Sequence, residues 1–203
     1  MSKFDEQILV VKRDIIFDKE KNAFNGFITK NDPKFSEIVE TLPSFEVKRR
    51  GDMEEDPSYK QLISYAIVTS GNETLVYKRL TGGGETRLHG LLSIGVGGHM
   101  NDIEDVEDIK EKMFINASRE LQEEVGIKES ELKSFEVIGL INDDENEVGK
   151  VHIGLVFKVE VDKTHIFTNE EDTLELIWTK DNELKAQSPF ESWSELIIRD
   201  AYA

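Results

Sequence analysis

Three acidic side chains in this sequence could share one chemical task. Glu120, Glu123 and Glu124 occur at positions i, i+3 and i+4, which places them on one face of a helix. Like charges at this spacing repel, and no lysine between Glu120 and Ile127 relieves the repulsion. A hard divalent cation, Mg²⁺ or Mn²⁺, would relieve it by binding carboxylate oxygens. For these three residues alone, an acidic, solvent-facing helix surface is the better explanation in so acidic a chain.

A helix over residues 106–125 is predicted to carry the glutamates. Apolar residues recur at helical spacing and form a stripe for the core: Phe114, Ala117, Leu121 and Val125. Gly126 follows the last of them, where a helix often ends in a left-handed conformation. The helix can therefore bury one face and present the carboxylates beside it.

The string from Arg119 to Ile127 carries a more specific signal. It consists of Arg-Glu, an aliphatic residue, any residue, Glu-Glu, any residue, glycine and an aliphatic residue, and it resembles the core motif of the Nudix hydrolase family. Chance would produce such a match on the order of 10⁻⁴ times per chain of this composition. The family pattern also has a glutamate eight positions before the arginine, and Glu111 stands there. The resemblance covers roughly residues 61–196.

The start of the motif departs from the family pattern. The glycine pair that opens it corresponds to Gly97-Gly98, so an acidic, loop-like insertion lies within residues 100–110. This insertion could be a lid, an extra helical turn or a bulge. The segments 93–99 and 142–154 further resemble a Nudix subgroup known as predicted phosphoesterases.

The resemblance implies a fold, a reaction and a metal site. The expected fold is an α/β/α sandwich with a mixed sheet between helices, together with an N-terminal α+β extension. The expected reaction is divalent-metal-dependent hydrolysis of a phosphoanhydride in a nucleoside diphosphate linked to another moiety. Glu120, Glu123 and Glu124 would bind Mg²⁺ or Mn²⁺, and the backbone carbonyl of Gly97 would be a further ligand.

Other residues receive supporting roles from the same resemblance. Arg119 is grouped with the catalytic glutamates, as the partner of a nearby carboxylate, and Glu111 is expected to support the metal site from behind the ligands. Arg79, Arg87 and His99 are candidates for binding substrate, because such side chains can donate hydrogen bonds to phosphate oxygens. Each of these three is more often a solvated or structural side chain when it occurs alone.

The family often uses one more acidic residue from outside the motif as base or ligand. The sequence does not choose among the candidates Glu145, Glu147, Glu170, Glu171 and Glu175. Lys78, His89 and His152 are weaker candidates for contacts with substrate.

Strands and turns are predicted on both sides of the central helix. Strands are expected at 8–11, 14–17, 24–28, 62–69, 74–77, 91–96, 135–141, 151–161 and 174–178. Further helices are expected at 35–42 and around 190–199, and residues 49–57 have the composition of a linker or exposed loop. The predicted division is an extension over 1–57 and a Nudix domain over 58–203.

Composition restricts the partners and the location. The net charge of −17 argues against bulk nucleic acid, whose phosphates need a basic surface. No apolar run is long enough for a membrane span, and without cysteine there is no disulfide or thiolate zinc site. The first residues lack the features of a secretion signal, so a cytoplasmic location is expected. The apolar strands of residues 1–57 suggest a homodimer.

Two other functions compete with hydrolysis. A Nudix-fold protein could bind a nucleotide or nucleotide sugar without turnover, although the intact glutamates and the acidic charge argue against a DNA-binding sensor. Isopentenyl diphosphate isomerase shares the fold but depends on a cysteine that this chain lacks. The substrate stays open, since residues 132–151 contain no proline or tyrosine that would mark ADP-ribose or dinucleoside polyphosphates.

Overall fold

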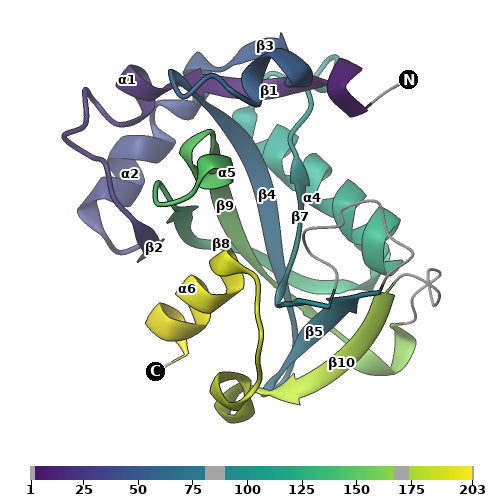
Figure 1. The fold of residues 1–203 in the computed structure, drawn as a ribbon. Helices are drawn as coiled ribbons and strands as arrows, with labels where there is room; N and C mark the ends of the chain where they lie inside the picture. Colours follow the sequence, from purple (N-terminus) through teal and green to yellow (C-terminus); the bar gives the residue numbers. More distant parts are fainter. Residues whose placement is uncertain (1–2, 81–89, 167–173, 203) are drawn as a thin grey trace.

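Ten strands in the described part of the chain form one mixed sheet, with helices on both of its faces (Figure 1). The computed structural model describes residues 3–80, 90–166 and 174–202, apart from the side chains of Arg79 and His165. The central strand order is β10-β5-β4-β9-β8-β2, and β1, β3, β6 and β7 pair outside this path. The strands are β1 Gln7–Lys12, β2 Gly26–Thr29, β3 Glu46–Arg49, β4 Tyr59–Ser70, β5 Glu73–Arg79, β6 Leu92–Ser93, β7 Gly95–His99, β8 Leu132–Asn142, β9 His152–Val161 and β10 Leu174–Lys180.

Strands β4 and β9 form the centre of the sheet. They pair in parallel, from Gln61 opposite His152 to Thr69 opposite Glu160. All of β4 except its two end residues is buried, as expected for a strand that is covered on both faces. Strands β5, β7 and β8 pair antiparallel with these two, which makes the sheet mixed. The predicted α/β class, with a mixed sheet between helices, is confirmed.

Helix α4 (Ile109–Val125) covers one face of the sheet. The Asp108 side chain caps its start by accepting from the backbone N–H of Lys110, and Gly126 ends it at φ 72°. Four residues of its apolar stripe belong to the same core as Leu62 of β4: Met113, Ala117, Leu121 and Val125. The predicted helix is confirmed, although it begins at Ile109 instead of residue 106.

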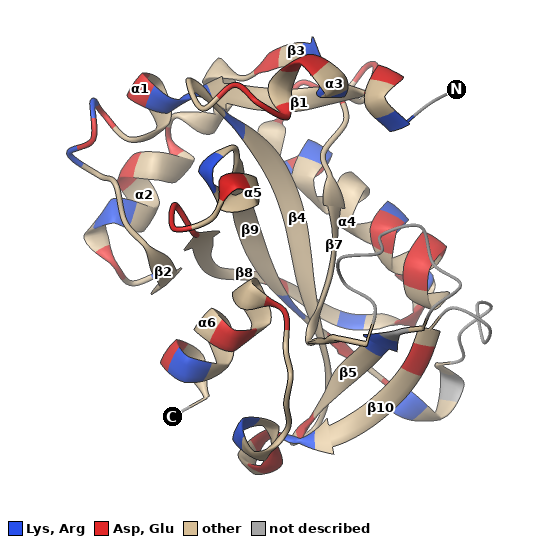
Figure 2. Cartoon of the chain, viewed as in Figure 1, with Lys and Arg blue, Asp and Glu red and all other residues tan. Residues whose placement is uncertain are grey.

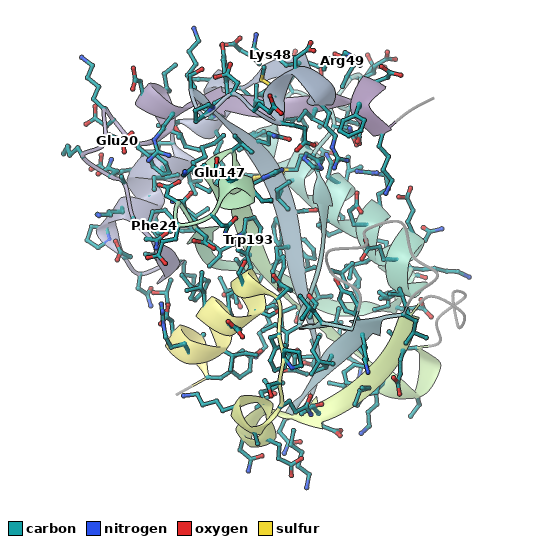
Figure 3. The ribbon with its side chains drawn as sticks, in the orientation of Figure 1. Glu20, Phe24, Lys48, Arg49, Glu147 and Trp193 are labelled. Carbon is teal, nitrogen blue, oxygen red and sulfur yellow. The ribbon has the colours of Figure 1, made fainter. Side chains whose placement is uncertain are left out.

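Helix α6 (Ser192–Ala201) covers the opposite face. Trp193 projects from it onto the sheet (Figure 3), and its ring centroid lies 5.6 Å from that of Tyr65. A Cβ at Gly154 of β9 would lie 2.6 Å from the Trp193 ring, so only glycine allows this approach. The predicted C-terminal helix is confirmed.

The segment before residue 58 adds strands to the same sheet. Strand β1 pairs antiparallel with β3 on one side and with the start of β4 on the other. The helices of this segment lie around β1, β2 and β3 (Figure 1). No helix among the described residues has the length and apolar character needed to cross a membrane. The remaining helices and 3₁₀ turns are η1 Lys3–Asp5, α1 Arg13–Ile16, α2 Pro33–Val39, η2 Leu42–Ser44, α3 Arg50–Met53, η4 Glu129–Glu131, α5 Glu147–Lys150, η5 Lys163–His165 and η6 Asp181–Ala186.

Two predictions for the N-terminal segment are wrong. The expected strand at 14–17 is mostly helix α1, and the backbone N–H of Phe17 donates to the carbonyl of Arg13. An apolar run this short does not distinguish a strand from one helical turn. The expected loop at 49–57 instead contains the end of β3 and helix α3, whose Met53 is buried. Helix α3 could not be predicted from the sequence because Met53 is its one apolar residue, so no apolar periodicity marks it.

Two further boundaries differ from the sequence analysis. Helix α2 begins at Pro33, where Asp32 caps it, and it ends at Val39 before a separate 3₁₀ turn. The insertion within 100–110 forms no extra helical turn. It folds back onto α4, since the backbone N–H of Asn101 donates to Asn116 Oδ1 and Asp102 accepts from the ammonium of Lys112 at 2.6 Å.

A buried ion-pair network ties the N-terminal segment to the loop before β9. The fully buried Lys60 donates to Asp144 at 2.7 Å and to the carbonyl of Gly149 at 2.9 Å. Arg13 donates to the same carboxylate at 2.8 Å. Burial alone would raise the pKa of Asp144, but the hydrogen bonds from Arg13 and Lys60 outweigh it and lower the pKa to about 2. The ionised carboxylate therefore stabilises the folded state.

Asp144→Asn is expected to lower the free energy of unfolding by about 2 kcal/mol at neutral pH, because it removes the counter-charge of Lys60. The folded pKa lies below the usual value, so this contribution is present above about pH 4 and is lost as the pH falls toward 2. Urea unfolding between pH 2 and pH 6 would measure it. Asp18→Asn, in an exposed pair with Lys21, is the control. Parallel pH profiles for wild type and Asp144→Asn would contradict the assignment.

Candidate active site

The three glutamates of the motif lie toward the C-terminal end of α4, where Figure 2 marks acidic residues in red. Glu120 is turned inward and is 9% exposed, whereas the Glu123 side chain is 60% exposed and Glu124 is half-buried. A Cβ on Gly98 of β7 would lie 2.2 Å from Cδ of Glu120. The carboxylate of Glu120 therefore packs directly against the strand backbone, and only glycine leaves the space for it.

Burial raises the pKa of Glu120 to about 7. The charge of Arg119 opposes this rise, whereas the charges of Glu124 and Glu123 add to it. Near neutral pH the carboxyl is thus close to half protonated. A divalent cation would favour the ionised form, because it binds carboxylate oxygen in preference to the protonated group.

The donor chemistry of this face fits a hard divalent cation. Three carboxylates lie within about one helical turn, and one of them is forced toward its neutral form by burial and by the other two. Within the described ranges, no three acidic or histidine side chains already converge on a common point. Cation binding therefore requires Glu123 and Glu124 to turn toward Glu120.

Arg119 links the glutamates to β7. Its Nη2 lies 2.8 Å from Glu120 Oε1 and donates to the backbone carbonyl of His99 at 3.0 Å. Its Nη1 lies 3.5 Å from Glu123 Oε2. The side chain thus contacts two of the three carboxylates and the strand that carries the glycine pair.

A hydrogen-bonded histidine pair lies beside the glycine pair. His152 Nδ1 is 2.6 Å from the Val148 carbonyl, so this nitrogen carries the hydrogen and Nε2 accepts. The Gln61 amide donates to the Met53 carbonyl, so its oxygen faces the ring of His99. His99 Nε2 must then be the donor, 2.7 Å from Gln61 Oε1 and 3.2 Å from His152 Nε2. The network fixes both tautomers.

Both rings of this pair are neutral at neutral pH. Burial is the main cause that lowers the pKa of His99, to about 2, and the charges of Arg50, His152 and Arg119 lower it further. Burial also lowers the pKa of His152, against a hydrogen bond to Val148 that raises it. Burial thus disfavours protonation of both rings, and their printed hydrogen bonds go to protein groups, which fits a positioning role for the pair.

The N-terminal segment reaches this site through α3 and through Glu6, which follows η1. Arg50 donates through Nε to Glu54 at 3.0 Å and through Nη1 to Glu6 at 3.3 Å. The other oxygen of Glu6 accepts from Asn101 Nδ2 at 2.9 Å, and the charge of Glu6 contributes to the raised pKa of Glu120. Residues outside the motif region therefore act on its carboxylates.

The other predicted site residues are not gathered with the glutamates. Glu111 is exposed in the first turn of α4, away from the glycine pair. Lys78 lies opposite Glu175 between β5 and β10 and lines a separate hollow of about 400 Å³. Arg87 and the side chain of Arg79 lie outside the described residues. The same holds for the candidates His89, Glu170 and Glu171.

Sequence reasoning missed three residues at this site: Glu6, Arg50 and Gln61. Gln61 lies in a strand interior, and nothing in its neighbours distinguishes a buried amide from an ordinary strand residue. Arg50 and Glu6 come from a segment whose packing one sequence does not reveal. The spacing of Arg50 and Glu54, at i and i+4, was the one available signal of a helical turn there.

Comparison with known proteins places this geometry in a family. No family model matches the chain. The protein YmaB of Bacillus subtilis is 41% identical over 203 residues, covering 98% of both chains. The crystal structure of Tm1382, which has been assigned to the Nudix hydrolases, superposes with a TM-score of 0.77 at 31% identity, covering 96% of this chain and 97% of that one. The chain belongs to the Nudix hydrolase family. This Nudix protein thus carries the family motif on α4.

More distant solved structures share the fold alone. A MutT Nudix hydrolase from Burkholderia pseudomallei is 18% identical with a TM-score of 0.52, covering 70% of this chain and 98% of that one. The Nudix domain of Shewanella oneidensis NrtR, complexed with ADP ribose, is 14% identical with a TM-score of 0.51, covering 70% and 86%. Both matches leave part of this Nudix chain uncovered.

Gly98→Ala is expected to lower the free energy of unfolding by about 1–3 kcal/mol, because the new methyl group would overlap the Glu120 carboxylate. Urea unfolding in EDTA measures the effect. In a chain that also carries Glu120→Ala the overlap is absent, so Gly98→Ala should cost less there. Equal costs in the two backgrounds would show that the contact is not the cause.

Proposed function

We propose that this Nudix protein is a divalent-metal-dependent hydrolase that cleaves a phosphoanhydride in a nucleoside diphosphate linked to another moiety. One observation carries the proposal: Glu120, Glu123 and Glu124 are all present on one face of α4, and Glu120 lies against the backbone of Gly98. Burial raises the pKa of Glu120, and carboxyl groups with such raised pKa values are concentrated at functional sites.

The residues of the site divide the chemical work. Glu120, Glu123 and Glu124 would hold Mg²⁺ or Mn²⁺ together with the Gly97 carbonyl. When bound, the cation would neutralise charge on the diphosphate and lower the pKa of an attacking water. Arg119 would orient Glu120, lies near Glu123, and donates to the carbonyl of His99 on β7.

A small nucleotide derivative is the favoured substrate class. The structure of the NrtR Nudix domain with ADP ribose supports such a ligand for this fold, and the net charge of −17 disfavours a nucleic acid polymer. We include ADP-ribose, NADH, nucleotide sugars, deoxynucleoside triphosphates and diadenosine polyphosphates in the substrate panel.

Glu123→Gln should reduce turnover of the best panel substrate at least about a hundredfold, because it removes one of the charges that hold the cation. Phosphate release with Mg²⁺ or Mn²⁺ measures turnover, and isothermal calorimetry measures Mn²⁺ binding without turnover. Glu129→Gln, at an exposed glutamate of η4 outside the motif, is the matched control and should keep its activity.

Unchanged turnover in Glu123→Gln would contradict the assignment of the motif as the metal site. Tight binding of one panel compound, with no turnover by wild type under either metal, would instead establish a nucleotide or nucleotide-sugar sensor. The test therefore separates an enzyme from a binding module on the same fold.

The extension over 1–57, the Nudix domain over 58–203, a homodimer and a cytoplasmic location stay predictions. The exposed apolar residues Phe4, Ile15 and Val47 lie in the extension, which is where a second copy would be expected to pack. A monomer at high concentration in sedimentation equilibrium would exclude the dimer.

A further inference from the structure

Arg50 belongs to the extension and is joined to the candidate active site through hydrogen-bonded neighbours. It is the first residue of α3, and the carbonyl of Met53 in the same short helix accepts from the buried Gln61 amide. That amide bonds to His99, so α3 is joined to the residue that follows the glycine pair. Glu6 gives a second link, because it accepts from Arg50 and from Asn101, two residues after His99.

Two carboxylates hold the Arg50 guanidinium in one orientation. Glu54 accepts from Nε, and Glu6 accepts from Nη1. Nη2 has no hydrogen-bond partner among the described residues, and it is not among their buried unpaired atoms. The side chain as a whole is 18% exposed. The guanidinium is therefore fixed on one side and open to solvent at Nη2.

Strand β7 offers a place for a ligand between α4 and Arg50. In the described part of the sheet β7 pairs with β4 alone, so its second edge has no strand partner, and Tyr77 donates to the Gly95 carbonyl of this strand. Arg119 of α4 reaches this strand at the carbonyl of His99. A ligand that lies along the free edge of β7 would therefore have the glutamates of α4 on one side. One end of that ligand would lie near His99, where the strand ends.

Each of the two arginines at this edge is paired with two carboxylates, and they differ in their remaining donors. Arg119 is already engaged by Glu120, Glu123 and the His99 carbonyl. Arginine recognises phosphate oxygens through hydrogen bonds with fixed geometry, and a guanidinium held by neighbouring carboxylates loses little freedom when it binds.

We propose that Arg50 is a substrate-binding residue whose Nη2 donates to a phosphate oxygen of a ligand lying along the free edge of β7. The nature of that ligand, a nucleoside diphosphate derivative, rests on the proposed function. Glu6 and Glu54 act as positioning residues for the guanidinium. The extension is then part of the site and supplies a contact that the family motif does not contain.

Binding of imidodiphosphate, a diphosphate that resists hydrolysis, tests the proposal without turnover. Calorimetric titration in Mg²⁺ compares wild type, Arg50→Gln and Arg49→Gln. Arg49 is the preceding residue on β3, is labelled in Figure 3, and pairs with Asp5 and Asp52 instead. Arg50→Gln should weaken binding at least about tenfold, while Arg49→Gln should leave it within about twofold of wild type.

Histidine ring signals in NMR spectra add a readout of position. Imidodiphosphate should shift the His99 and His152 signals in wild type and in Arg49→Gln, and shift them less in Arg50→Gln. If Arg50→Gln does not unfold cooperatively, Arg50→Lys replaces it, and weaker binding by that variant supports the proposal. No binding by wild type, equal binding by wild type and the Arg50 variant, or an equal loss in the two arginine variants would overturn it.

The outcomes keep this inference apart from the proposed function. Arg50-dependent binding of imidodiphosphate without turnover of any panel substrate would establish the phosphate contact and refute the hydrolase. Turnover by wild type, with KM and imidodiphosphate binding both unchanged in Arg50→Gln, would support the hydrolase and refute the contact.

Discussion

The close approach of Glu120 to the backbone of Gly98 is the constraint around which the site is arranged. It requires glycine at position 98. It also requires a fixed position of α4 relative to β7, which the apolar stripe of the helix maintains. It also removes water from the carboxyl, which raises its pKa to about 7. A displaced α4 would lose the contact and, with it, the burial that raises the pKa of Glu120. The packing of the core therefore also determines the chemical environment of the site.

The extension is linked to the same arrangement through β7. Strand β1 lies beside β4, and α3 holds Gln61, which in turn fixes the ring of His99. Glu6 lies near enough to influence Glu120. These contacts connect residues before position 58 with the glycine pair on which Glu120 packs.

Much of the fold could be predicted from sequence, because its signals are local. The apolar stripe and Gly126 define α4, and continuous β-forming residues define β4 and β9. The glutamate spacing, reinforced by the motif around it, predicted which side chains share a face. Asp14 to Phe17 and residues 49–57 could not be assigned in the same way, since four or five residues do not establish a period. Their conformation depends on contacts with β4 and with the loop before β9.

The site was predictable only where its residues are consecutive or helically spaced. Gln61, His99 and His152 come from three strands, and no sequence pattern states that their side chains meet. Arg50 and Glu6 reach the site from a segment with no family signature. Lys78 was a reasonable candidate by residue type, but the sheet places it beside Glu175 at a separate hollow. The face of the sheet on which a strand residue lies follows from the alternation of side chains along the strand. Its neighbours on that face follow only from the pairing register.

The Arg13–Asp144 contact has a consequence for how the chain acquires its structure. Its two residues are 131 positions apart, and Asp144 also receives the buried ammonium of Lys60. During translation the N-terminal segment emerges from the ribosome well before Asp144 has been synthesised. Lys60 therefore lacks this counter-charge for much of the synthesis of the chain. Contacts of such long separation slow folding and leave apolar strands exposed meanwhile. The early segment of this protein is therefore the part that most needs protection from aggregation until the last strands emerge.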